Sequence, residues 1–118
     1  MTLNQEQNLA VEHVEGPLLV LAGAGSGKTK VVTHRIAKLI EMGIMPSDIL
    51  ALTFTNRAAN EMKKRVQHLV KTSVLTCTFH SLGAKILRET ISTLGYRFDF
   101  TIYDEEDSEK LLKTCLKH

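Results

Sequence analysis

Short apolar runs separated by longer amphipathic stretches dominate the pattern of hydrophobic and polar positions along the chain. The apolar runs at 17–22, 49–54 and 74–78 are too short for helices. The stretches around them repeat apolar residues every three or four positions, as amphipathic helices do. We expect buried strands in the three runs, an extended segment at 98–103, and helices that begin at Asn4, within 22–29, at Asn56, near Ser81 and at Asp104.

Strands that alternate with helices in this order predict right-handed β-α-β units and a parallel α/β sheet. The carboxyl ends of parallel strands meet at one edge of the sheet, and such sheets bind ligands there. Segments 23–29, 54–56 and 79–81 each follow a predicted strand. We therefore expect these three segments to share one rim.

The glycine-rich loop, Ala-Gly-Ala-Gly-Ser-Gly-Lys-Thr at 22–29, lies where a predicted strand turns into a helix. Gly23, Gly25 and Gly27 allow positive φ angles and let the backbone approach a ligand without a Cβ in the way. Backbone N–H groups at a helix N-terminus attract anions. The loop in this context predicts a nucleotide phosphate site. The alternative, purely structural interpretation is a turn that binds no ligand.

Two side chains at the end of the loop add chemistry to that backbone site. Lys28 would reach the β- and γ-phosphates, and the Thr29 hydroxyl would coordinate Mg²⁺. The usual phosphate-loop string begins with glycine, so Ala22 is a departure from it.

Composition is that of one ordinary globular domain, with 118 residues, 43% hydrophobic and 24% charged. No apolar run reaches membrane-spanning length, and the N-terminus lacks a secretory pattern, so we expect a cytoplasmic protein without a membrane partner. Cys77 and Cys115 match no metal or redox spacing, which favours reduced thiols.

Positive charge is concentrated in the middle of the chain. Residues 28–97 hold twelve Lys or Arg against four Asp or Glu, whereas the whole chain has a net charge of +2. A basic middle suits a polyanionic partner such as nucleic acid. Charge alone favours the simpler interpretation of solvated helix faces.

The two other rim segments combine an aromatic ring with polar groups. Phe54 would stack a base, and Thr55 and Asn56 would bind a phosphate together with helix N-terminal N–H groups. In the structural alternative, Phe54 belongs to the core and Asn56 is only a helix cap.

The sequence Thr-Phe-His-Ser at 78–81 repeats this design after the next strand. In its structural alternative Phe79 lies in the core and His80 caps a helix. A metal role for His80 is disfavoured because no second ligand lies at zinc-like spacing. Two rim segments of one kind strengthen the nucleic-acid interpretation of both.

Acidic residues follow the extended segment, at Asp104 through Asp107. A strand-end acid would hold Mg²⁺ in a nucleotide hydrolase. Consecutive acids are also typical of a helix N-terminus, and we favour that interpretation.

Taken together, these stretches closely resemble the N-terminal end of the UvrD/Rep group of superfamily 1 DNA helicases, and their sequence is nearest to that of Rep. Leu3-Asn4-x-x-Gln7 resembles their Q motif, and the glycine-rich loop resembles motif I, in which alanine at the first position is normal. Segment 53–62 resembles motif Ia, and segment 78–83 resembles the motif after it. The resemblance runs from Leu3 to at least Leu116.

The resemblance implies an ATP- and Mg²⁺-dependent motor that moves 3′ to 5′ on single-stranded DNA and unwinds partial duplexes. It implies a three-layer, RecA-like fold, with 1–82 as part of the first ATP-binding domain and 83–118 as the start of an inserted helical subdomain. The family's acidic Mg²⁺ motif and arginine finger lie beyond residue 118, so hydrolysis by this chain alone is expected to be negligible. Replication or repair proteins would be its partners.

The resemblance also implies roles for individual residues. Gln7 would read the adenine edge, Lys28 would hold the γ-phosphate, and Thr29 would bind Mg²⁺. Lys30 stands where the family often has arginine. The implied nucleotide contacts are Gln7, Ala22, Gly23, Ala24, Gly25, Ser26, Gly27, Lys28, Thr29 and Lys30, and the implied DNA contacts are Phe54, Thr55, Asn56, Thr78, Phe79 and His80.

Two other functions remain open on the sequence. A P-loop kinase for a nucleotide or small metabolite would use Asp104 or Glu105 to hold Mg²⁺. A nucleic-acid-binding module without catalysis would use the basic third helix.

Overall fold

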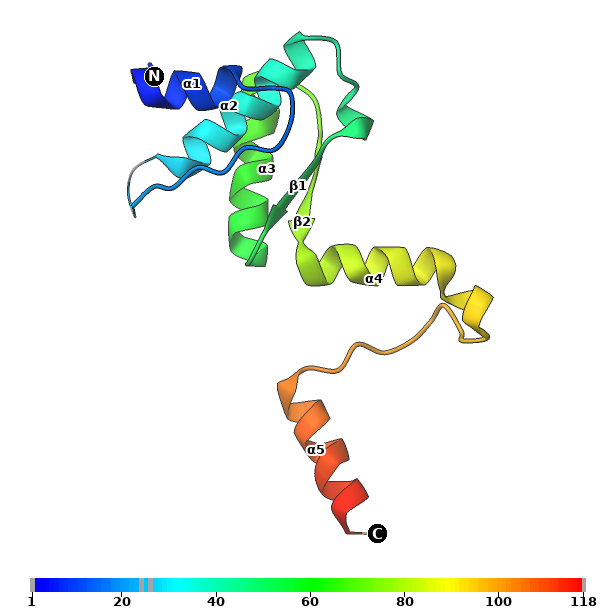
Figure 1. The fold of residues 1–118 in the computed structure, drawn as a ribbon. Helices are drawn as coiled ribbons and strands as arrows, with labels where there is room; N and C mark the ends of the chain where they lie inside the picture. The colour runs from blue at the N-terminus through cyan, green and yellow to red at the C-terminus, as the bar shows by residue number, and fades with distance from the viewer. Residues whose placement is uncertain (1, 24, 26, 118) are drawn as a thin grey trace. The chain divides into compact units, whose positions relative to one another are not determined.

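The computed structural model describes residues 2–23, 25 and 27–117. The chain divides into two compact units, Met1–Leu82 and Gly83–His118. Figure 1 follows the chain through both.

The first unit is an α/β arrangement around a two-stranded parallel sheet. Strand β1 (Leu50–Thr53) pairs with strand β2 (Leu75–Thr78) in a register that places Leu50 beside Leu75 and Thr53 beside Thr78. Its elements in chain order are α1 (Gln5–Glu12), α2 (Lys28–Glu41), the 3-10 turn η1 (Pro46–Asp48), β1 (Leu50–Thr53), α3 (Asn56–Val70), β2 (Leu75–Thr78) and the start of α4 (Phe79–Thr90).

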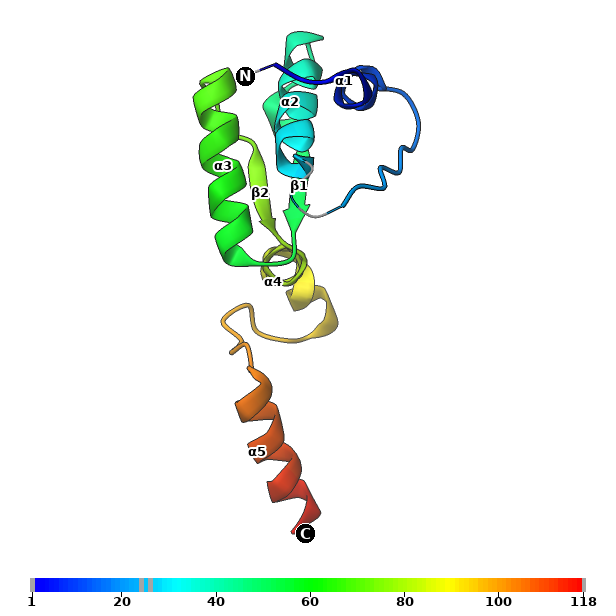
Figure 2. The same cartoon turned by 90° about the vertical axis from the view of Figure 1, so that its left-hand side faces the viewer.

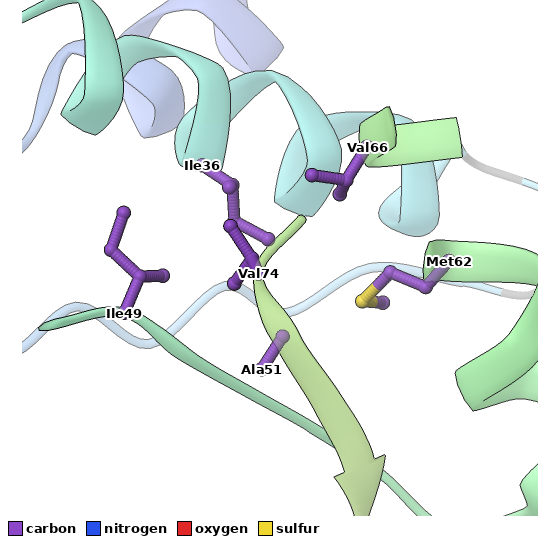
Figure 3. Close-up of a cluster of buried hydrophobic side chains, with 6 residues drawn as sticks. All are labelled: Ile36, Ile49, Ala51, Met62, Val66 and Val74. Carbon is purple, nitrogen blue, oxygen red and sulfur yellow. The ribbon is translucent and has the colours of Figure 1, made fainter. Parts of the chain in front are cut away.

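A single apolar cluster joins the sheet to α2 and α3, as Figure 3 shows. Both helices cover the same face of the sheet because their apolar stripes share this cluster. Its buried members are Ile36 from α2, Ile49 just before β1, Ala51 within β1, Met62 and Val66 from α3, and Val74 just before β2.

The described residues of this unit build two layers rather than the three that were predicted. On the uncovered face of the sheet, Leu50 and Leu75 remain 46% and 42% exposed. The parallel pairing and the flanking helices are confirmed, whereas the third layer stays a prediction.

The strand predicted at 17–22 is absent from the structure. Leu19 and Leu21 are 81% and 88% exposed, and the segment forms no strand. A strand requires a neighbour for its backbone hydrogen bonds. Among the described residues, β1 and β2 pair only with each other, so this apolar run has no strand beside it.

The caps of α3 and α4 are threonine hydroxyls that lie one or more residues earlier than predicted. Thr55, not Asn56, caps α3, because its side chain accepts a hydrogen bond from the Ala58 N–H at 3.1 Å. The Thr78 hydroxyl accepts from the Ser81 N–H at 3.1 Å, and α4 accordingly begins before Ser81.

The second unit contains most of α4, the 3-10 turn η2 (Ile91–Leu94) and α5 (Glu105–Leu116). Segment 98–103 is not a strand. It is held to α4 by Arg88, whose guanidinium lies 4.7 Å from the centre of the Phe100 ring. Asp104 and Asp107 form a reciprocal capping box at the start of α5, which confirms the helix-start interpretation of these acids.

None of the helices within the described residues has the length and apolar composition needed to span a membrane.

Truncation of Val66, which is 1% exposed, tests the central cluster. Val66→Ala removes two methyl groups from a packed core and should lower the free energy of unfolding by about 2 kcal/mol. The matched variant Leu69→Ala, on the same helix but 42% exposed, should cost clearly less. Urea denaturation measures both, and equal losses would contradict the core assignment.

Candidate functional site

Helix α1 packs along one side of α2. Ala10 and Val11 of α1 pack on Val31 of α2. The Arg35 guanidinium donates to the carbonyl oxygens of Ala10, at 3.0 Å, and His13, and so satisfies the C-terminal end of α1. These contacts fix α1 next to the start of α2, where the glycine-rich loop ends.

Two further basic side chains of α2 bind the same neighbour. Lys38 Nζ lies 3.4 Å from Glu12 Oε2 at the end of α1. Lys30 Nζ donates to the backbone oxygen of Thr2 at 2.6 Å, just before α1. Lys30 therefore holds the N-terminal segment in this structure.

A capping box at the start of α1, formed by Asn4 and Gln7, orients the Gln7 side chain. The Asn4 N–H donates to Gln7 Oε1 at 2.9 Å, and the Gln7 N–H donates to Asn4 Oδ1 at 2.8 Å. With its oxygen held there, the amide directs Nε2 toward the glycine-rich loop. A Cβ built on Gly27 would lie only 2.7 Å from that nitrogen.

Two of the three glycines in the loop have the positive φ angle that the sequence predicts. Gly25 and Gly27 have φ angles of 75° and 84°, whereas Gly23 does not have a positive φ. Gly27 is the N-cap of α2, so the N–H groups of the first turn are open to a ligand. Ala24 and Ser26 lie outside the described residues.

A pocket of about 190 Å³ lies between α1, the segment before the loop and the first turn of α2. Gln7 and Ala22 form parts of its wall together with Lys28. Lys28 and Thr29 are exposed, at the start of the helix whose dipole favours anions. The structure thus brings together Gln7, Ala22 and Lys28, which the sequence placed in one nucleotide site.

Phe54 and Phe79 form a second cluster, at the ends of the paired strands. Phe54 follows β1 and Phe79 follows β2, and the Thr53–Thr78 register sets them side by side. Their ring centroids are 5.9 Å apart with an interplanar angle of 43°. Phe54 is 90% exposed and Phe79 is 56% exposed, so neither belongs to the core.

The polar groups around these rings are divided between structural and exposed positions. Thr78 is buried, and its hydroxyl contacts the Ser81 hydroxyl at 2.9 Å as well as the Ser81 N–H. The Thr55 hydroxyl caps α3. Asn56 and His80, which cap neither helix, are exposed in the first turns of α3 and α4.

The two clusters lie toward the same end of the sheet. Figures 1 and 2 show that α2 and α3 both run against the direction of the strands. The start of α2, with the glycine-rich loop, therefore lies toward the end where β1 and β2 finish. This orientation matches the shared rim expected for a parallel α/β sheet.

Sequence reasoning did not find Arg35, Thr2 or Ser81 as supports of these clusters. The sequence held one indication of the role of Arg35, because Arg35 lies four residues after Val31 and therefore on the same face of α2. The partners of Arg35 and Lys30 are backbone oxygens of another element, and a backbone oxygen has no sequence signature.

Among the described residues, no group of three His, Cys, Asp or Glu side chains could hold a metal ion. A single hydroxyl such as that of Thr29 suits Mg²⁺ only when phosphate oxygens and water complete its shell.

Comparison with known proteins gives one family and close relatives. Residues 3–118 match the family model described as UvrD/REP helicase N-terminal domain. The chain is 50% identical over 119 residues to the ATP-dependent DNA helicase PcrA of Staphylococcus epidermidis, and 49% identical over 120 residues to that of Staphylococcus aureus. Each alignment covers 98% of this chain and 16% of the relative.

Alanine at Gly27 tests the contact between α1 and the loop. Gly27→Ala forces a left-handed conformation on a residue with a Cβ, at about 1–2 kcal/mol, and also displaces the Gln7 amide from its capping bond. Urea unfolding of Gly27→Ala, Gln7→Ala and the double variant should give a coupling energy of about 0.5 kcal/mol or more.

Gly43→Ala is the matched control, because Gly43 has a φ of 97° and no atom near a built Cβ. It should carry the conformational cost but show no coupling to Gln7→Ala. Zero coupling at Gly27 would mean that Gln7 does not touch the loop.

Proposed function

The chain belongs to the UvrD/REP helicase N-terminal domain family, and we propose that it supplies the phosphate loop and part of the DNA track of an ATP-dependent DNA helicase. The proposed motor moves 3′ to 5′ along single-stranded DNA and unwinds partial duplexes. The observation that carries the DNA part is the exposed Phe54–Phe79 pair at adjoining strand ends.

In the proposed nucleotide site, the backbone N–H groups of 22–29 bind phosphate oxygens and Lys28 neutralises the γ-phosphate. Thr29 coordinates Mg²⁺, which neutralises charge on the phosphates when bound. Gln7 reads the adenine edge, a role supported by its place in the pocket beside Lys28. Because Lys30 is engaged with Thr2, its contact with the nucleotide requires that bond to open.

In the proposed DNA site, Phe54 and Phe79 stack on bases of one strand, because exposed aromatic rings offer faces on which bases stack. Asn56 and His80 are exposed beside them and bind the backbone. Thr55 and Thr78 lie on the same path, but their hydroxyls cap helices. Their contribution is to orient the first turns of α3 and α4.

We further assign 1–82 to the first RecA-like domain, and 83–118 to the start of an inserted helical subdomain. Hydrolysis by this chain alone would be negligible, because the acids at 104–107 begin a helix and none ends a strand there. A cytoplasmic motor of this kind would act with replication or repair proteins. The same helix start leaves the kinase alternative without support, because Asp104 is a cap.

Two substitutions at Gln7 separate base recognition from helix capping. Gln7→Glu keeps the side-chain oxygen that accepts from Asn4 but loses the Nε2 donor, whereas Gln7→Ala loses both. Both should weaken ATP binding about tenfold, a loss of about 1.4 kcal/mol, and should weaken GTP less. Calorimetric titration of both nucleotides measures this.

Thermal unfolding supplies the control, because Gln7→Glu should keep the stability that Gln7→Ala loses. If Gln7→Glu binds ATP as the parent chain does, Gln7 is a capping residue and not a reader of adenine.

Loss of either ring tests the DNA track. Phe54→Ala and Phe79→Ala should each weaken binding of an oligothymidylate by about 1–3 kcal/mol because a stacking ring is removed. Phe98→Ala removes a ring of similar exposure, 68%, from the second unit and serves as the matched control. Fluorescence anisotropy measures the affinities, and equal effects at all three positions would contradict the proposed track.

A further inference from the structure

Arg35 of α2 holds the C-terminal end of α1 through two directed hydrogen bonds. Its Nη1 donates to the carbonyl oxygen of Ala10 at 3.0 Å and to that of His13. The last carbonyl groups of a helix have no partner within it, and α1 has no basic residue in its own last turn. The cation that a helix C-terminus attracts is therefore supplied by the neighbouring helix.

The other contacts between the two helices do not fix the position of α1 in the same way. The apolar contact with Val31 is non-directional, so it allows α1 to shift along its neighbour. Lys38 lies 3.4 Å from Glu12, whose side chain is 63% exposed, and a surface pair of this kind contributes little. Lys30 binds the segment before α1 and not the helix itself. Among the described residues, Arg35 thus makes the contacts that set the place of α1 along α2.

The position of α1 determines where the Gln7 amide lies. Ala10 is three residues after Gln7, about 4.5 Å along the helix axis, so the two residues move together when the helix shifts. A Cβ built on Gly27 would lie 2.7 Å from Gln7 Nε2, so the amide lies directly against this glycine. Arg35 is not among the described residues that line the pocket beside the loop, and it lines an adjoining cavity of about 390 Å³. Arg35 is thus linked to Gln7 through α1.

We propose that Arg35 is a positioning residue that holds the Gln7 amide against Gly27 and, through Gln7, gives the nucleotide site part of its preference for adenine. The first half of this proposal rests on the contacts above alone, whereas the second half rests on the proposed function. A guanidinium suits the role, because this planar group presents its N–H donors in fixed directions. Loss of the two bonds should let α1 shift and should reduce base selection without removing the phosphate loop.

The position of Gln7 can be measured without a ligand. Arg35→Met keeps an aliphatic stem but removes every N–H donor, and Lys38→Met is the matched control because it breaks the ion pair from α2 to α1. In the isotope-labelled chain, the nuclear Overhauser effect between the Gln7 side-chain amide protons and the Gly27 α-protons should be present in the parent and in Lys38→Met. It should be lost in Arg35→Met.

Base selection is measured by calorimetric titration with ATP, GTP and inorganic tripolyphosphate. Arg35→Met should weaken ATP binding about fivefold, less than the loss of Gln7 itself, and should lower the ratio of ATP to GTP affinity. Tripolyphosphate has no base and should bind within about twofold of the parent chain. In a Gln7→Ala background, Arg35→Met should change the ratio no further, because both substitutions remove the same contact. Lys38→Met should leave all three affinities unchanged.

Circular dichroism shows whether each variant folds. If Arg35→Met does not fold, Arg35→Lys replaces it, because lysine keeps a donor on a side chain that is one bond shorter. The same losses are then expected at reduced size.

An Overhauser effect that is unchanged in Arg35→Met, or lost equally in Lys38→Met, would overturn the positioning role. Equal weakening of ATP, GTP and tripolyphosphate, or a ratio that responds to Gln7→Ala but not to Arg35→Met, would overturn the link to adenine. Should Gln7→Ala itself leave the ratio unchanged, the proposed adenine contact would fail, and the Overhauser effect alone would still decide whether Arg35 positions Gln7.

Discussion

The packing of α2 between the sheet and α1 is the constraint on which both candidate sites depend. One side of α2 places Ile36 in the cluster with β1 and α3. Another side of α2 packs Val31 against α1 and carries Arg35 and Lys38, which bind α1. Lys30, on the same helix, binds the backbone of Thr2 just before α1. Because the glycine-rich loop leads directly into α2, burial of this helix also fixes where the loop and its open N–H groups point.

The docking of α1 has a chemical consequence at the loop. A helix of eight residues has little stability alone, so its position is owed to the contacts with α2. Those contacts bring the Gln7 amide to a glycine whose missing Cβ leaves room for it. Gly27 therefore serves two needs, a positive φ before α2 and space for a neighbouring side chain.

The parallel register of β1 and β2 determines where the two aromatic rings lie. Two strands that end level, at Thr53 and Thr78, deliver Phe54 and Phe79 to adjoining positions. Each phenylalanine lies beside a threonine whose hydroxyl caps the following helix. The two threonine hydroxyls cap the helices, and both rings are left exposed. Because the rings are exposed, they forgo the stabilisation that burial of an aromatic side chain would give.

The sequence by itself determined the features that depend on neighbours within about four residues. These are the helices, the capping box at Asn4, the acidic helix start at Asp104, and the left-handed glycines at 25 and 27. Family membership also followed from the motifs. Only the tertiary structure decided that 17–22 stays outside the sheet, that Lys30 binds Thr2 and that Phe54 is exposed. Strand pairing and burial depend on residues far away in the chain, and an apolar or aromatic side chain looks the same in sequence whether a partner covers it or not.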